Sequence, residues 1–238
     1  HEFNPKTGRS ITLDLDYNQF NTNTSNDLTI YPTEQLSNRS LSEQVVKQPV
    51  DIWVVKSDYI HPFDSTFKFE TGLKSSFASV DNRLNFFRNG IKSSTESNDF
   101  LYKENILGAY INLSKNLKKF DFNAGVRIEN TNVSGTTLDS LVLDRNYLQW
   151  FPSASALYHI NKNMGIQSSF SRRLNRPGFQ QQNPFINFID SLTYTRGNPK
   201  LLPEISNTAQ LNFTYDGQPV AGISYSVTND VIIENAPQ

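Results

Sequence analysis

The chain has 238 residues, of which 37% are hydrophobic and 12% aromatic, a formal net charge of -1 and no cysteine. This aromatic content argues against global disorder, the near-neutral charge gives no reason to expect nucleic acid, and the lack of cysteine excludes disulfides and thiolate chemistry. No run approaches the roughly 18 apolar residues of a membrane helix, so a helical membrane protein is excluded. The segment HEFNPKTGRS at positions 1–10 has neither the basic start nor the apolar run of a signal peptide, so none is expected there.

Taken in chain order, the elements follow one pattern, in which apolar and polar side chains alternate with the period of two that is typical of β-strands. The runs cover residues 11–17, 66–79, 121–129, 148–160 and 211–215. The chain as a whole predicts about nine strands of about 10 to 14 residues and no amphipathic helix. Strands of that length suit a bilayer crossing better than a soluble sheet, whose strands average about 5 to 6 residues.

Two places depart from the pattern. Between Val50 and Val55 both faces are largely apolar, so the alternation does not assign an outward face. Pro152 lies inside a regular run and cannot donate a backbone hydrogen bond, which predicts a bulge or a strand end near Phe151.

The connections between strands are of two kinds. The short polar ones are expected at residues 4–8, 61–65, 116–119, 161–163 and 216–218. The long polar ones are expected at residues 21–43, 80–99, 133–146 and 175–203. Short turns at one end of a sheet and long loops at the other are typical of a transmembrane β-barrel. The predicted fold is therefore all-β, a portion of an antiparallel up-and-down transmembrane barrel that fills residues 1–238 as a single partial domain.

Several short segments support this prediction by resemblance. They are Phe151-Pro152, SRRLNRP at 171–177, NPF at 183–185, GNP at 197–199 and LPE at 202–204. In order and spacing they resemble the barrel of TonB-dependent receptors, most closely the Bacteroidetes-type outer-membrane β-barrel group. Weaker matches, DY before HPF at 58–63 and AGVRIE at 124–129, extend the resemblance over most of the chain.

The resemblance implies a bacterial outer-membrane protein of about 22 strands around a plug domain, which imports a scarce nutrient with energy relayed from the inner membrane. The nutrient could be an iron chelate, a vitamin or an oligosaccharide. The implied partners are outer-membrane lipid and lipopolysaccharide, and in the full-length protein its own plug domain and the TonB complex. Neither a plug nor an energy-coupling motif is recognised in residues 1–238, so an internal barrel fragment is expected.

The longest predicted loop contains most of these motifs. Its Pro and Gly residues fix or widen the allowed φ, which predicts that they shape the loop. The motif residues given this structural role are Arg173, Arg176, Pro177, Asn183, Pro184, Gly197, Asn198, Pro199, Pro203 and Glu204. If the alternation continues past Phe170, Arg172 points outward at the rim of the barrel. Its guanidinium could bind lipopolysaccharide phosphates there. The alternative is a hydrogen bond from Arg172 to loop backbone or to a lumen carboxylate.

Aromatic side chains on the expected extracellular loops could stack on a ligand, or could pack the loops together. The candidate ligand-binding residues are Phe86, Phe87, Arg88, Phe179, Phe185, Phe188 and Tyr194.

Catalysis has little support, because His1, His61 and His159 lack metal-ligand spacing and no nucleophile or phosphate-loop motif occurs. We therefore expect no enzyme activity, no cofactor and no metal. Two alternatives to transport remain: a soluble or surface β-sandwich that binds glycans, and an outer-membrane enzyme whose catalytic groups lie outside these residues. The sandwich predicts that Phe67, Phe69, Leu73 and Phe77 pack against a second sheet, and the barrel that they face lipid.

Overall fold

The computed structural model describes residues 2–4, 8–30, 40–137, 140–189 and 193–234. Ten antiparallel strands form one sheet, in the order β1-β2-β3-β4-β5-β6-β7-β8-β11-β12. The strands are β1 (Glu2–Asn4), β2 (Arg9–Ile30), β3 (Ser40–Pro62), β4 (Phe67–Arg88), β5 (Ile91–Asn116), β6 (Phe120–Thr137), β7 (Ser140–His159), β8 (Met164–Asn175), β11 (Glu204–Tyr215) and β12 (Gln218–Asn229). Apart from the three-residue β1, these are the nine or so strands that the alternation predicts.

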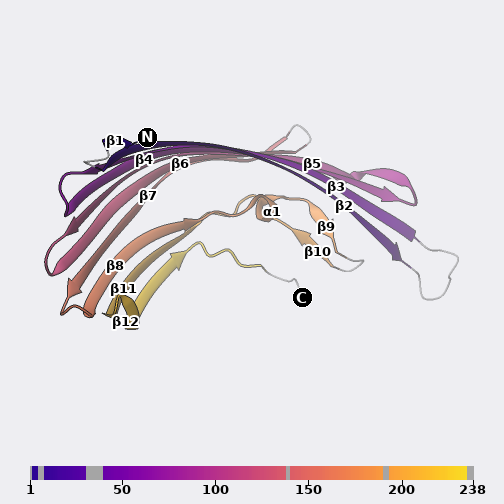
Figure 1. Cartoon of the computed structure of the whole chain (residues 1–238). Coiled ribbons are helices and arrows are strands. Elements are labelled where there is room, and N and C mark those ends of the chain that lie inside the picture. Colours follow the sequence, from indigo (N-terminus) through magenta and orange to yellow (C-terminus); the bar gives the residue numbers. More distant parts are fainter. Residues whose placement is uncertain (1, 5–7, 31–39, 138–139, 190–192, 235–238) are drawn as a thin grey trace.

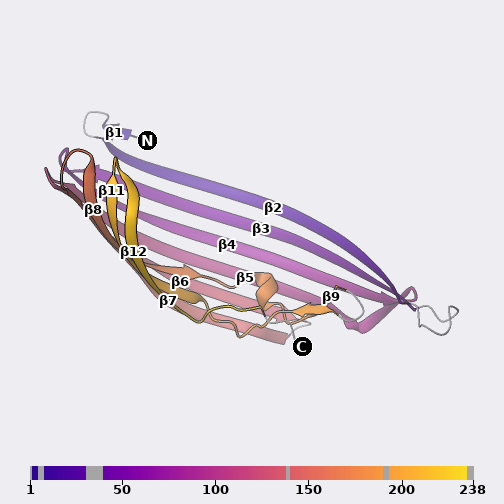
Figure 2. The same cartoon turned by 90° about the horizontal axis from the view of Figure 1, so that it is seen from below.

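The sheet is a single curved layer with a convex and a concave side (Figure 1). Each strand pairs with the next strand of the sheet, and the order follows the chain throughout. The segment between β8 and β11 lies on the concave side, where it contains the helix α1 (Phe179–Gln182) and the hairpin of β9 (Ile186–Phe188) and β10 (Tyr194–Arg196) (Figure 2). Among the described residues, no helix is long and apolar enough to cross a membrane.

Most of the short turns are where the sequence predicts them. Residues 63–66 join β3 to β4, 117–119 join β5 to β6, 160–163 join β7 to β8, and Asp216-Gly217 joins β11 to β12. Part of the first predicted turn, residues 5–7, lies outside the described residues. The β11–β12 turn has φ of 48° at Asp216 and 76° at Gly217, as a tight two-residue hairpin requires.

The strands from β2 to β7 are longer than expected, at 18 to 26 residues. The predicted long loop at 80–99 is wrong, because β4 and β5 remain paired up to Arg88 and Ile91 around a turn at Asn89-Gly90. Both turn residues have positive φ, 49° and 80°. An Asn-Gly pair is a strong hairpin signal, so the sequence contained the evidence for this turn.

Two other predicted loops are also shorter than expected. The β6 and β7 strands run to Thr137 and from Ser140, and only residues 138–139 between them lie outside the described residues. The β2 and β3 strands run to Ile30 and from Ser40, with residues 31–39 outside. The outer parts of these strands have polar residues on both faces, because a strand that leaves the bilayer needs no apolar face. The alternation of apolar and polar residues therefore does not predict them.

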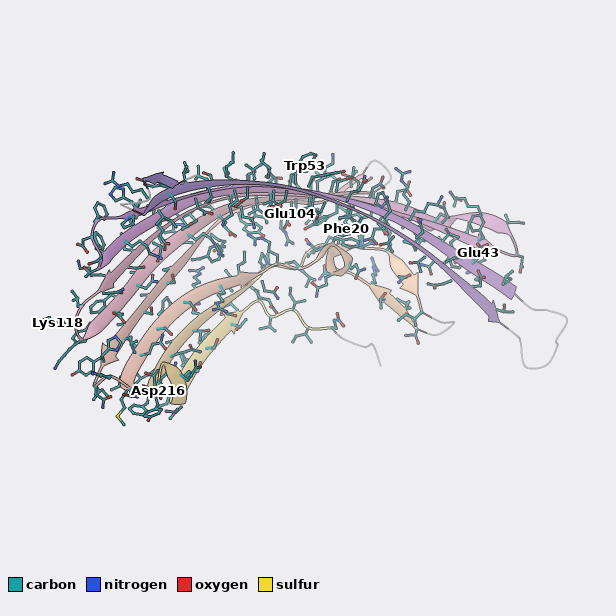
Figure 3. All side chains as sticks on the ribbon, viewed as in Figure 1. Phe20, Glu43, Trp53, Glu104, Lys118 and Asp216 are labelled. Atoms are coloured by element: carbon teal, nitrogen blue, oxygen red, sulfur yellow. The ribbon has the colours of Figure 1, made fainter. Side chains whose placement is uncertain are left out.

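The convex face carries a band of exposed apolar side chains. One row of paired residues, Leu13, Ser57, Leu73, Ala109, Ile128 and Trp150, crosses six strands. Leu13 is 67% exposed and Leu73 62%, which is unusual for leucine in a sheet. Figure 3 places Trp53 on the convex side and Glu104 on the concave side, which assigns the outward face of 50–55 to Trp53 and Val55.

The band ends at a second row, formed by Tyr17, Trp53, Phe77, Asn105, Asn132 and Asn146. The Tyr17 and Trp53 rings stack at 4.3 Å between centroids. The next convex row, Gln19, Asp51, Ser79, Lys103, Ser134 and Asp144, is entirely polar.

At the short-turn end the band finishes among stacked rings. The Phe63 and Phe67 rings lie 5.0 Å apart, and Phe120 packs on Tyr158 at 4.9 Å. From Phe67 to Phe77, at about 3.3 Å per residue and a tilt of about 40°, the band is about 25 Å tall, which is the height of the apolar band of outer-membrane barrels. Trp150 lies within the band, in the row of Leu73.

Pro152 produces no bulge, because it pairs in register with Val126 on β6. The pairing of β7 with β8, however, stops at Ser153 and Ser171, one residue short of Pro152. Beyond that point β8 diverges from β7 (Figure 1). The predicted bulge and the predicted strand end near Phe151 are therefore both wrong, since β7 runs from Ser140 to His159; what ends beside Pro152 is the pairing of β7 with β8.

Candidate functional site: a loop docked on the concave face

The segment between β8 and β11 does not extend away from the sheet. Residues 176–189 and 193–203, here called the docked loop, lie on the concave face and contact β3, β5, β6 and β7. The contacts are of three kinds: arginine clamps, an aromatic cluster and amide hydrogen bonds.

Two arginines clamp the docked loop to the sheet from opposite directions. Arg176, in the loop, donates to Glu129 Oε2 at 2.5 Å and to Thr131 Oγ1 at 3.0 Å on β6. Arg145, on β7, donates to the backbone carbonyls of Pro199, at 2.9 Å, and Leu201. Charge-assisted hydrogen bonds of this kind are stronger than neutral ones, so both ends of the loop are fixed.

An aromatic and aliphatic cluster lies between the clamps. Its buried members are Val80, Phe100, Tyr102, Val133 and Leu143, with Val50, Phe179 and Phe185 packed against them. Phe100 is completely buried, and its ring meets that of Phe185 edge-on at 6.3 Å. Fully burying an aliphatic or aromatic side chain contributes about 1.5 to 3 kcal/mol, so this cluster stabilises the docked position together with the clamps.

Buried amide side chains complete the interface. Gln44, on β3, is 3% exposed and donates to Asn187 Oδ1 at 2.6 Å. Gln182, in α1, is also 3% exposed and donates to the Tyr102 hydroxyl at 3.4 Å and to the Pro177 carbonyl at 2.9 Å. Sequence analysis missed Gln44, Tyr102 and Arg145, because no local pattern pairs these strand positions with a distant loop.

The docked loop is also rigid internally. The backbone N–H groups of Gly197 and Asn198 donate to the carbonyls of Asn183, at 2.8 Å, and Gln181, at 2.6 Å. A Cβ on Gly197 would lie 2.5 Å from the carbonyl oxygens of Asn183 and Gln180, a distance that real Cβ atoms do not adopt. Glycine is therefore required at this position by close backbone packing.

The remaining motif residues also make loop contacts. The Asn183 and Asn198 side chains accept from the N–H groups of Phe185, at 3.1 Å, and Lys200, at 2.9 Å. The Pro184 carbonyl accepts from Arg196 Nε at 2.9 Å. All three contacts lie within the docked loop, and the structural role of the motif residues stays a prediction.

Glu204 closes the base of the loop. Its two carboxylate oxygens accept from Asn175 Nδ2 and from the backbone N–H of Ile232, each at 2.6 Å. One side chain thus ties the start of β11 to the end of β8 and to the segment after β12. Pro203 precedes it, and Arg173 is exposed on β8.

Arg172 does not point away from the concave side as the alternation predicts. Its Nη2 donates to Gln149 Oε1 on β7 at 3.3 Å. Gln149 is on the concave side, since it pairs with Glu129 of β6, and the pairing of β8 with β7 has already ended at Ser171. The acceptor is thus a side-chain amide, not a carboxylate or a backbone carbonyl, and lipopolysaccharide binding by Arg172 stays a prediction.

The other candidate ligand residues are dispersed. Phe179 and Phe185 pack on the cluster, and Phe86 is 5% exposed on β4. Phe87 lies beside Arg88 near the β4–β5 turn, and the Phe188 side chain lies outside the described residues. Tyr194 is 48% exposed on β10. Among the six candidates whose side chains the structure describes, it does not bring all of them together at one site.

The tip of the β4–β5 hairpin has its own ion pair. Arg88 Nη2 donates to Glu96 Oε1 at 2.6 Å and Arg88 Nε donates to Oε2 at 2.9 Å. These bonds lower the pKa of Glu96 below its ordinary value. Both side chains are partly solvated, so the pair contributes little to stability.

Below the docked loop the concave face is polar. Tyr110 crosses over Gly72 to donate to Asp58 at 2.6 Å, and Asn112 donates to Glu70 at 3.0 Å. A hollow of about 580 Å³ near the short turns is lined mainly by polar and charged side chains, such as Lys68, Asp64 and Asp121, and by four apolar ones, Pro62, Phe67, Phe122 and Leu157. Within the described ranges no group of three His, Asp or Glu side chains could hold a metal ion.

An apolar convex band of bilayer height, a polar concave face and a strictly sequential antiparallel sheet define a transmembrane β-barrel wall. A model of the outer membrane protein beta-barrel family matches residues 1–238, and the chain belongs to that family. It is accordingly a protein of the bacterial outer membrane.

Solved structures support the same fold. The chain is similar to the ferric yersiniabactin uptake receptor FyuA from Yersinia pestis (15% identity, TM-score 0.55), covering 93% of this chain and 34% of FyuA. It is similar to P. aeruginosa FpvA in complex with a ferric pyoverdine, with 14% identity and a TM-score of 0.60, covering 95% of this chain and 31% of FpvA. It is also similar to the E. coli ferric-catecholate import receptor Fiu, with 12% identity and a TM-score of 0.57, covering 90% of this chain and 37% of Fiu. The chain thus spans about a third of the length of these receptors. No curated protein gives a significant sequence match.

Proposed function

We propose that the chain is part of the barrel wall of a TonB-dependent receptor that takes up a scarce nutrient, such as an iron chelate, a vitamin or an oligosaccharide. The observation that carries the proposal is the division of one sheet into a lipid-facing convex band and a polar concave face. Family membership and the fold of receptors named for ferric-siderophore uptake and import support it.

The mechanism that follows is capture of the nutrient on the extracellular side and passage along the polar concave wall. The proposed partners are lipid and lipopolysaccharide, and in the full-length protein a plug domain and the TonB complex. Among the candidate ligand residues, Arg88 and Tyr194 are the ones that we propose as ligand contacts, because their side chains are exposed while Phe86, Phe179 and Phe185 are packed. No catalytic role is proposed for any residue.

The sandwich alternative has less support. It requires the outward side chains of β4 to pack against a second sheet, whereas Leu73 is 62% and Phe77 40% exposed.

Uptake assays on the full-length protein test the function. Cells that express it are given radiolabelled ferric citrate, cyanocobalamin or maltoheptaose, with and without a protonophore. We expect energy-dependent accumulation of one of these probes, or of another member of its class. Binding without energy-dependent accumulation would point to a surface binding protein instead.

Spin-label accessibility, scanned from Phe67 to Phe77 in the same protein, tests the orientation. High oxygen accessibility at odd positions and high polar-reagent accessibility at even positions are expected, because side chains alternate between lipid and lumen. Odd positions shielded from both reagents would contradict the barrel wall.

A further inference from the structure

The concave face contains an exception to the polarity of a barrel lumen. Interior positions of such barrels are polar because they face water. Val80, Phe100, Tyr102, Val133 and Leu143 are inward-facing and apolar, and all five are buried at the level of the docked loop. Phe179 and Phe185 of the docked loop pack against these wall residues and keep them from water.

Polar wall residues at the same level show the same dependence. Thr131 has no exposed surface and bonds to Arg176 of the loop. Gln44, 3% exposed, bonds to Asn187 of the loop. The wall is therefore complementary to the loop in shape, in polarity and in hydrogen bonding.

The docked loop is also held in shape by its own hydrogen bonds and held on the wall by the two arginine clamps. Its backbone is cross-linked by the Gly197 and Asn198 hydrogen bonds, which tie the segment around Gln181 and Asn183 to the segment around Asn198. The two arginine clamps hold its beginning and its end, at Arg176 and at the carbonyls of Pro199 and Leu201.

We propose that the docked loop is a fixed constriction of the lumen, which remains on the wall with or without cargo and limits the cross-section through which cargo passes. Its role in limiting cargo rests on the proposed uptake function, whereas its fixed position does not. The docked loop then determines which cargo passes, through the cross-section that it leaves open. It does not act as an outer loop that closes over captured ligand.

Distances between spin labels in the full-length protein test the fixed position. One label replaces Thr195, exposed on β10, and the other replaces Asn105, exposed on the convex face of β5. We expect one narrow distance distribution without ligand, unchanged by ferric citrate, cyanocobalamin or maltoheptaose. A broad or two-peaked distribution without ligand, or a shift on adding a probe, would overturn the proposal.

Release variants show whether the clamps are responsible. R145M and R176M each remove a clamp, and together they should abolish the narrow peak. R83M is the matched control, since Arg83 lies on the outer part of β4 and bonds to Asp81 of its own strand at 2.5 Å. A narrow peak that survives removal of both clamps, or that R83M also abolishes, would contradict the assigned anchoring.

Locking the loop tests its role in passage. The chain has no cysteine, so the pair Q44C and N187C can be bridged by a short bifunctional maleimide. Uptake of the transported probe should be unchanged by the bridge, as it should be in the control pair S206C and T228C, which joins β11 to β12. Loss of uptake only in the Q44C–N187C bridge would show a moving lid and overturn the proposal. If no probe is transported, the uptake function fails while the distance measurement still decides the position of the loop.

Discussion

The protein has two apolar surfaces on opposite faces of one sheet, and they differ in what covers them. The convex band around Leu73 is largely exposed, whereas the concave cluster around Phe100 is buried by a loop of the same chain. Side chains of similar polarity are thus stabilised by lipid in one region and by tertiary packing in the other. The comparison shows that an apolar residue in a barrel strand does not by itself identify the lipid face.

The largest expected loss of stability comes from a substitution in the buried concave cluster. Phe100→Ala should lower the free energy of unfolding by about 3 to 5 kcal/mol, because it leaves a cavity beneath the docked loop. Denaturant titration of the full-length protein in lipid vesicles measures it. Phe77→Ala, on the convex face, is the control and should cost clearly less, because lipid fills the space; equal losses would show that Phe100 is not a packed core residue.

A charge on the lipid face gives the next effect. Leu73→Lys should cost about 2 to 4 kcal/mol in the same titration, because Leu73 lies in the middle of the convex band. Ser76→Lys, on the concave side of the same strand, should cost little, since that face is wet. The opposite ranking would reverse the assignment of the two faces.

The internal packing of the docked loop gives a smaller effect. Gly197→Ala should cost about 1 to 3 kcal/mol, because the new Cβ would collide with two backbone carbonyls that cannot move independently. Hydrogen exchange of the loop amides measures the change. Gly178→Ala is the matched control, since its nearest neighbour would be 3.9 Å away, and similar exchange in both variants would contradict the close packing of Gly197.

The smallest effect lies at the opposite end of the sheet, in the β3–β4 turn. Hydrogen bonds from the Thr66 hydroxyl and the Thr66 and Phe67 N–H groups lower the pKa of Asp64 to about 2. Because the folded-state pKa is below the ordinary value of about 3.9, the turn gains stability that is complete above pH of about 4 and is lost as the pH falls toward 2. Carbon-13 NMR of the Asp64 carboxyl should show a midpoint near 2; a midpoint near 4 would mean that these hydrogen bonds do not form.

Much of the fold could be predicted from local patterns. Alternation identified the strands, and short polar segments such as 116–119 and 161–163 identified the turns, because both depend on neighbouring residues only. The lengths of β4 and β5 could not be predicted from alternation, since their outer parts leave the bilayer and lose the apolar face. The Asn89-Gly90 pair, by contrast, is a local signal for the turn between the two strands.

The docked loop was the least predictable part. The sequence marked residues 175–203 as a long, motif-rich loop and gave Gly197 and Pro199 structural roles, but it placed the loop outside, where Phe179 and Phe185 could meet a ligand. Their positions depend on Phe100, Glu129 and Arg145, which lie 34 to 85 residues away in the chain.

The sequence by itself determined the sheet, its two faces and its two unlike ends, because each follows from a period of two and from turn chemistry. Only the tertiary structure decided that the longest loop folds inward. That outcome depends on apolar wall residues that are contiguous only when β4, β5, β6 and β7 lie side by side, and on two arginines whose acceptors are brought within reach by the same curvature.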